Sequence, residues 1–198
     1  MVGENVQLVC TRYEEKEAHP TQEAFNVDFA MPWQRKPYGA VKIEITFDEP
    51  VLFTPAPRPL LVTYGDVEAD ILSYALEEVI TEKLRAAPQT VANREKRIAQ
   101  GKGGWLKPRG RDYYDLWQIV NAPGSVDWDA VARKLAEKCA VRGVSIASAR
   151  DVFATEITDG VKRNWKGQLE DFVPAPLPDV EDLLAKLEPA LASRLGWK

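Results

Sequence analysis

The sequence predicts an α+β fold, in which a small N-terminal β-sheet is followed by a C-terminal helical bundle. Alternating apolar and polar residues, typical of strands, occur before residue 48, whereas apolar residues at helical spacing follow after about Gly65. A proline-rich bridge, EPVLFTPAPRP, separates the two patterns. Because strands come first and helices second, α+β is favoured over a βαβ architecture. We expect a β-region at 1–65 and a helical domain at 66–198.

The composition is that of an ordinary globular chain. Its 198 residues include 26 basic and 30 acidic ones, and no run approaches the roughly 18 apolar residues that a membrane span requires. Cys10 and Cys139 lie far apart without metal-binding spacing, which favours a reducing, cytoplasmic location with no membrane partner. His19, beside Pro20 in a polar stretch, is expected in an exposed loop, so histidine-dependent catalytic triads are poorly supported.

Three runs near the N-terminus have the character of strands. They are Val6 to Tyr13, Phe25 to Met31 and Ala40 to Phe47. In the third, VKIEITF, four apolar residues share one face and three polar residues, Glu44 among them, share the other. This alternation predicts a half-buried strand.

The first long helix is predicted over LEEVITEKLRAA, and Pro88 should stop or kink it. Lys83 falls inside its apolar stripe. Its side chain either snorkels at the edge of the stripe or presents a cation to phosphates. Three charged residues are expected on the opposite side of the helix: Glu78, Glu82 and Arg85.

Residues 94–111 carry seven basic residues against one glutamate. Glycines in the middle and at the end of this segment predict a mobile loop there, which either brings cations to a polyanion or is simply a solvated basic surface. Trp105 can stack on a base or anchor the loop to the core, and anchoring is favoured. The candidate nucleotide- or RNA-binding residues are Lys102, Lys107, Arg109 and Arg111.

The next helix is RDYYDLWQIV, with an apolar side that includes Tyr113 and Leu116. Asp112 lies at the margin of that side, where it caps the helix, compensates the helix dipole as a first-turn acid, or serves a functional site. Asp115 points further out and can pair with Arg111.

The remaining helices are expected to supply packing surface. One is capped by Ser125 or Asp127 and buries Cys139 as a core thiol. Two more run around Val152 to Leu169 and Val180 to Leu195.

Taken in order, KIEIT, LEEVITEKLRA and RDYYDLW resemble the later motifs of the AbiEii/AbiGii family, the nucleotidyltransferase toxins of bacterial abortive-infection and type IV toxin–antitoxin systems. R-D-x-Y-D-L-W is the most specific of these motifs. NWKGQL, from Asn164 to Leu169, is similar to the C-terminal pattern of the family, so the resemblance covers roughly residues 25–195.

The family is similar to the DNA polymerase beta-like nucleotidyltransferases, in which a Gly-Ser turn precedes an Asp-x-Asp pair that binds magnesium. That motif does not occur here, and Gly124-Ser125, followed by Asp127 and Asp129, has the wrong spacing. The resemblance implies that residues 1–65 are a partial nucleotidyltransferase-like region. It also implies that Glu44 is a ligand of Mg²⁺.

The resemblance further implies that Lys83 contacts nucleotide phosphates, and that Asp112 and Asp115 face it as catalytic residues. The implied donor is a nucleoside triphosphate, the acceptor is RNA, in particular tRNA, and the partner is a cognate antitoxin. Because the Asp-x-Asp pair is missing, we expect this chain to transfer no nucleotide by itself. The alternatives are an inactive remnant or C-terminal portion that binds RNA or an antitoxin, and an α+β interaction domain with a chance match.

Overall fold

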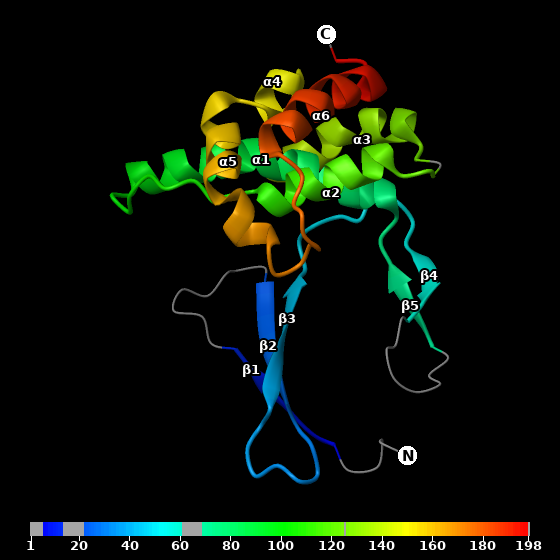
Figure 1. The fold of residues 1–198 in the computed structure, drawn as a ribbon, viewed down its shortest axis with the longest axis vertical. Helices are drawn as coiled ribbons and strands as arrows, with labels where there is room; N and C mark the ends of the chain where they lie inside the picture. The colour runs from blue at the N-terminus through cyan, green and yellow to red at the C-terminus, as the bar shows by residue number, and fades with distance from the viewer. Residues whose placement is uncertain (1–5, 14–21, 61–68, 125, 198) are drawn as a thin grey trace. The chain divides into compact units, whose positions relative to one another are not determined.

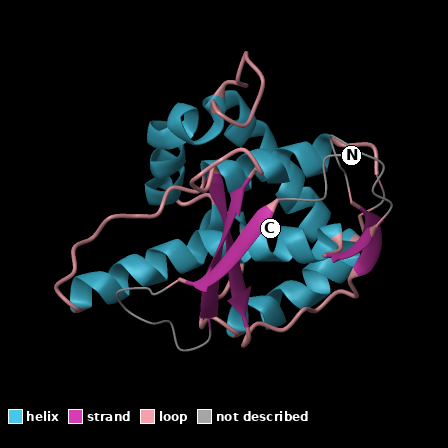
Figure 2. Cartoon of the chain, turned by 90° about the horizontal axis from the view of Figure 1, so that it is seen from below, coloured by secondary structure: helices cyan, strands magenta, loops and turns pink. Residues whose placement is uncertain are grey.

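The computed structural model describes residues 6–13, 22–60, 69–124 and 126–197. Within them all five strands precede all six helices, so the predicted α+β class is confirmed (Figures 1 and 2). The strands are β1 (Gln7–Arg12), β2 (Gln22–Ala30), β3 (Gly39–Thr46), β4 (Ala56–Pro59) and β5 (Asp70–Ser73). The helices are α1 (Leu76–Ala99), α2 (Gly110–Asn121), α3 (Trp128–Ala140), α4 (Ala149–Val152), α5 (Thr155–Leu169) and α6 (Val180–Leu195). The chain forms two compact units, residues 1–50 and 51–198.

The first unit contains an antiparallel sheet in the order β1-β2-β3, which confirms the three predicted strands. Val27 of β2 lies opposite Cys10 and Val41, so these residues share one face. The apolar side chains of β3 on this face, from Val41 to Ile45, are 41–54% exposed. The expected half-burial is therefore wrong, because the described elements of this unit place nothing over that face. Alternation determines which face is apolar, and a covering element determines whether it is buried.

A second, two-stranded sheet joins β4 to β5, with Ala56 opposite Ser73. The sequence pattern did not predict it, because Pro57 and Pro59 lack the N–H groups that a central strand needs. An edge position in a two-stranded sheet tolerates both prolines. His19, Gly65 and Ser125 lie outside the described residues, so the statements about them and the boundary at residue 65 stay predictions.

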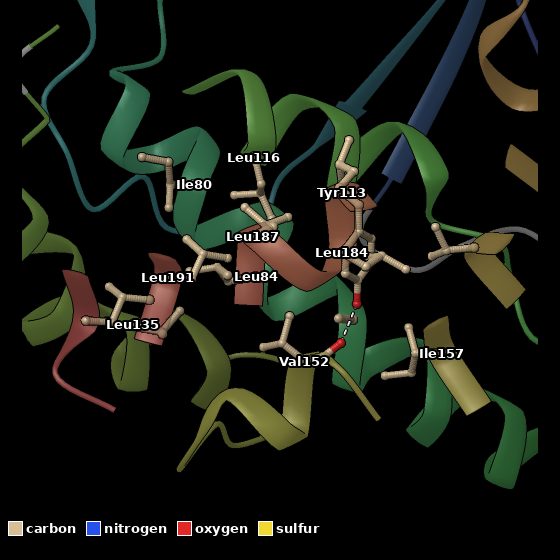
Figure 3. Packing of buried hydrophobic residues seen from close by; sticks show 14 of the residues in the cluster. Ile80, Leu84, Tyr113, Leu116, Leu135, Val152, Ile157, Leu184, Leu187 and Leu191 are labelled. Atoms are coloured by element: carbon tan, nitrogen blue, oxygen red, sulfur yellow. Dashed lines mark hydrogen bonds between the residues drawn. The ribbon is translucent and has the colours of Figure 1, made fainter. Parts of the chain in front are cut away.

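The helices of the second unit enclose one hydrophobic core, shown in Figure 3. The predicted stripe of α1 is confirmed at Ile80, Leu84 and Ala87, which are buried. Tyr113 of α2 is buried beside them, and its hydroxyl donates a hydrogen bond to the carbonyl oxygen of Val152 (Figure 3). Burial raises the pKa of the Tyr113 phenol, so this donor keeps its proton.

Helix α3 begins as predicted. Asp127 accepts a hydrogen bond from the backbone N–H of Ala130 at 2.8 Å, which caps the helix. Cys139 is a buried core thiol, and its burial raises its pKa. In the described parts of the chain, no helix combines the length and the apolar character that a bilayer crossing requires.

Helix α1 is 24 residues long and continues through Pro88. Of the two expected effects of this proline, a stop or a kink, the stop is therefore wrong. A proline inside a helix costs about 3 kcal/mol. Burial of Leu84, Ala87 and Thr90 on either side of Pro88 offsets this cost. As a consequence, residues 94–99 are helical, residues 110 and 111 belong to α2, and the loop of the basic segment is residues 100–109.

Candidate functional site

The ammonium group of Lys83, on α1, lies between two carboxylates of α2. Its Nζ is 3.1 Å from Oδ1 of Asp112 and 2.6 Å from Oδ2 of Asp115. The contact predicted between Lys83 and Asp112 is thus present. The Lys83 side chain is only 17% exposed, so it does not snorkel into solvent but ends at these two carboxylates.

These contacts determine the charge of Lys83. Burial alone lowers the pKa of the ammonium, but the hydrogen bond that Lys83 donates to Asp115 and the charges of Asp112 and Asp115 together raise it above its ordinary value. Lys83 is therefore a fixed cation at neutral pH and cannot act as a base there. Its chemistry is that of a positive charge held in place.

The local predictions about α2 hold only in part. Asp112 does not cap the helix, because the N-cap residue is Arg109 and no side chain accepts a capping bond; it lies in the first turn, where its charge compensates the helix dipole. Asp115 pairs with Lys83 rather than with Arg111. Arg111 instead lies over the ring of Phe172 at 3.9 Å and donates to the carbonyl oxygen of Gln168. A helical wheel of α2 alone could not show that a lysine from another helix approaches Asp115.

Lys83 and Asp112 line an open pocket of about 380 Å³ within the second unit, here called the Lys83 pocket. Arg85 and Arg109 also line it, so three cations face one volume. Arg109 lies 3.4 Å from Oδ2 of Asp112, whereas Lys83 contacts Oδ1. Such a cluster of held cations suits a ligand with several phosphate groups.

A buried ionic network supports one wall of this pocket. Lys138 of α3 bonds Glu78 at 2.7 Å and Glu82 at 2.5 Å, and Glu82 in turn pairs with Arg85. Glu82 and Arg85 line the Lys83 pocket, so the network extends from the core to the pocket surface. The expectation that these charged residues of α1 face away from the core is wrong, because α3 packs on that side and brings Lys138.

Glu78 also connects the start of the second unit to α1. Its Oε2 accepts hydrogen bonds from the backbone N–H groups of Leu52 and Phe53, at 2.8 and 2.9 Å. Lys134 of α3 donates to the Leu52 carbonyl. The carboxylate of Glu78 therefore fixes the chain before β4 onto the helices. No sequence pattern predicts this role, because Glu78 stands out only as a glutamate within a helix.

The NWKGQL motif positions the start of α2. Gln168 accepts a hydrogen bond from the Gly110 N–H at 2.6 Å and donates to the carbonyl of Pro108 at 3.3 Å. Trp165 and Leu169 of the same motif are buried in the core. Gln168 was expected only to supply packing surface. Instead it orients the first turn of α2, where Asp112 lies.

The basic segment forms a second pocket of about 250 Å³, here called the basic pocket. Its cationic side chains come from the last turns of α1 and from the loop that follows; they are Arg94, Lys96, Arg97, Lys107 and Arg109. Of the predicted RNA-binding residues, Lys107 and Arg109 line it, whereas Lys102 and Arg111 do not. The three α1 cations precede the glycines that predicted the loop, and they line the pocket because α1 continues past Pro88.

The favoured prediction that Trp105 anchors the loop to the core is wrong. Its side chain is 56% exposed and lies against the guanidinium of Arg97, 4.4 Å from the ring centroid. It lines the basic pocket beside Lys107.

The described residues do not fit a complete magnesium site. Glu44 lies on the polar face of β3, where it is 63% exposed and bonded to Lys42 at 2.7 Å. Asp28, a carboxylate on the neighbouring strand β2, lies opposite Ala40 and is therefore four residues, about 13 Å, along the strand from Glu44. No group of three potential metal ligands occurs in the ranges that the structure describes. Glu44 as a magnesium ligand stays a prediction from the family resemblance.

A comparison with the sequence models of protein families identifies the family of this chain. The sequence model described as "Nucleotidyl transferase AbiEii toxin, Type IV TA system" matches residues 6–186. No match was found among curated proteins or among solved structures. The matched range covers most of the chain and includes β1–β3, the Lys83 pocket and the NWKGQL motif. The chain therefore belongs to the AbiEii family of nucleotidyltransferase toxins, which are the toxins of type IV toxin–antitoxin systems.

Proposed function

We propose that the Lys83 pocket binds the phosphates of a nucleoside triphosphate, which is the donor in the nucleotidyl transfer to RNA that the family implies. The observation that carries this proposal is the position of Lys83 on the pocket wall, held by Asp112 and Asp115, in a chain of the AbiEii family. The raised pKa of Lys83 keeps it charged, as phosphate binding requires.

Each residue of the pocket has a distinct role in this proposal. Lys83, Arg85 and Arg109 neutralise charge on the phosphates, and positive charge held in place stabilises the additional charge that develops during transfer. Asp112 and Asp115 orient Lys83, and the exposed part of Asp115 is available to the acceptor. The Glu78–Lys138–Glu82 network fixes Arg85.

The family supplies the remaining parts of the proposal. RNA, in particular tRNA, is the acceptor, and a cognate antitoxin is the partner. The family typically uses a divalent metal, which would neutralise the triphosphate when bound. Because the described residues do not fit a magnesium site, no step of this proposal depends on one. Two unpaired cysteines agree with action in the reducing cytoplasm.

A second candidate function is an RNA- or antitoxin-binding module without transferase activity. The lack of a three-ligand metal cluster in the described residues favours it. Nucleotide binding distinguishes the two candidates. A chain that binds triphosphate through Lys83 supports the first, and a chain that binds RNA but no nucleotide supports the second.

Transfer itself is tested directly. The 198-residue chain is incubated with magnesium, each labelled nucleoside triphosphate and total tRNA, and label is followed into RNA and into protein. We expect no incorporation, since transfer needs metal-binding carboxylates that the described residues do not assemble. Incorporation that is lost in Lys83→Ala would overturn this expectation and show that the chain builds a working metal site.

A further inference from the structure

We propose that the basic pocket binds single-stranded RNA and holds the acceptor strand next to the Lys83 pocket. The identity of the strand as acceptor rests on the proposed function, whereas the binding site rests on the structure of the pocket. Four observations carry the inference: the charge of the lining, an exposed indole, a loop folded onto α1, and a shared arginine.

The lining of the basic pocket has one sign of charge. Five of its nine residues are cations and none is a carboxylate. Lys96 and Arg97 lie in the last turn of α1, where they also compensate the helix dipole. The dipole does not account for Lys107 and Arg109, which come from the returning loop. Arg94 and Arg109 pair with Glu156 and Asp112 outside the lining. The positive charge of the remaining lining attracts a phosphodiester backbone, which releases its counterions when it binds.

Trp105 gives the pocket an aromatic surface. Its indole is 56% exposed, and the Arg97 guanidinium lies over the ring at 4.4 Å. Single-strand sites pair a cationic groove with exposed aromatic rings on which bases stack. A free phosphate would contact only the cations of the pocket. A nucleic acid strand would contact the cations with its phosphates and the indole ring with a base, which favours RNA over an inorganic anion.

The loop that carries Trp105 is folded against α1 rather than free of it. Gly101 and Gly103 have φ values of 71° and 82°, which favour glycine, and turn the chain back at the end of the helix. The Lys102 carbonyl accepts a hydrogen bond from Arg97. Further along, Thr90 donates to the Lys107 carbonyl at 3.2 Å. The pocket is therefore formed before any ligand binds.

A close contact also fixes the loop before Trp105. A Cβ atom on Gly104 would lie 3.1 Å from Cδ1 of Ile98, so loop and helix touch at this point. Figure 1 shows the C-terminal turns of α1 extending beyond α5, and the same segment projects from the helices in Figure 2. A strand can approach the pocket along this projecting end.

Arg109 lines both pockets. A strand held in the basic pocket therefore ends within reach of the cations and carboxylates of the Lys83 pocket. This arrangement places the 3′ end of an acceptor beside the phosphates of a donor, without contact between the donor site and the rest of the strand.

The test is fluorescence anisotropy of a labelled single-stranded RNA of about ten nucleotides, within the size range of single-strand sites, titrated at several salt concentrations. The Lys96→Ala/Lys107→Ala variant should reduce the slope of log affinity against log salt by about 1.4, two contacts at about 0.7 each. Trp105→Ala should weaken binding about 5- to 150-fold, the equivalent of one stacked base, while Trp105→Phe retains most of the affinity.

The matched control is Lys166→Ala/Lys186→Ala, which removes two exposed cations on α5 and α6 and should leave affinity and slope unchanged. Equal losses in the control and in the pocket variant would overturn the proposal. The proposal would also be overturned if Trp105→Ala bound RNA as tightly as the wild type. Displacement of the RNA by tripolyphosphate at equal charge, or tighter binding of DNA of the same sequence, would contradict it as well.

Titration of the nucleoside triphosphate separates this inference from the proposed function. Lys83→Ala should weaken triphosphate binding at least about tenfold and leave RNA affinity within about twofold. If the wild-type chain binds no triphosphate but the RNA variants behave as expected, the proposed function fails and the RNA site stands. If triphosphate binds but RNA does not, the RNA site fails alone.

Discussion

Lys138 and Glu78 form an ion pair at 2.7 Å in which each side chain is only 1% exposed. Glu78 uses its second oxygen for the N–H groups of Leu52 and Phe53, and Lys138 also bonds Glu82. Burial lowers the pKa of Lys138, but the bonds to Glu78 and Glu82 raise it to a net value above normal, so the pair is charged. Such a pair is costly to break from one side only.

Lys138→Met should destabilise the second unit by about 3–5 kcal/mol, because Glu78 would be left buried without its cation. The measurement is the free energy of unfolding in urea, followed by tryptophan fluorescence. The control is Lys186→Met, which removes an exposed pair with Asp182 and should change stability by less than about 1 kcal/mol. A Lys138→Met variant as stable as the control would contradict the importance of the network.

Gly110→Ala tests the contact between α2 and α5. A Cβ at this position would lie 2.7 Å from Oε1 of Gln168, the atom that accepts the Gly110 N–H. We expect a loss of about 1–3 kcal/mol in the free energy of unfolding, from overpacking and a displaced glutamine. Gly167→Ala, with open space around its Cβ, should stabilise α5 by up to about 1 kcal/mol. Equal effects of the two substitutions would show that Gln168 does not constrain α2.

Leu191→Ala tests the helical core. Leu191 is fully buried, so its truncation should cost about 2–5 kcal/mol. Leu72→Ala removes the same atoms from a side chain that is 77% exposed, and should cost less than about 0.5 kcal/mol. Urea unfolding of both variants gives the comparison, and similar midpoints would argue against the described packing of α6.

Lys83 should contribute to stability in a pH-dependent manner. Because its pKa is raised in the folded chain, its contribution is fully present below the unfolded value of about 10.4 and is lost as the pH rises through the folded value. The difference in unfolding free energy between wild type and Lys83→Met should stay constant from about pH 8 to about pH 10 and shrink above that. A difference that shrinks below about pH 9 would indicate a lowered pKa.

Local patterns in the sequence predicted much of the fold. Strand alternation located β1–β3, and helical periodicity located the buried face of α1 around Leu84. Prediction from local patterns failed where tertiary packing overrides a local rule. Pro88 lies inside α1 because the flanking turns are buried, and β4 contains prolines because its sheet has only edges.

The candidate site divides in the same way. Periodicity placed Lys83 and Asp112 on inward faces, and the structure brings them to 3.1 Å. Glu78 and Gln168 were missed because their partners, Lys138 and Gly110, come from other helices. No periodicity within one helix carries that information.

Equilibrium dialysis of labelled nucleoside triphosphates tests the central claim most directly. The wild-type chain should bind triphosphate, Lys83→Ala should lose at least about tenfold in affinity, as expected for a charge-assisted phosphate contact, and Lys186→Ala should match the wild type. Equal affinities of the wild type and Lys83→Ala, or no binding by either, would contradict the assignment of the Lys83 pocket as the nucleotide site.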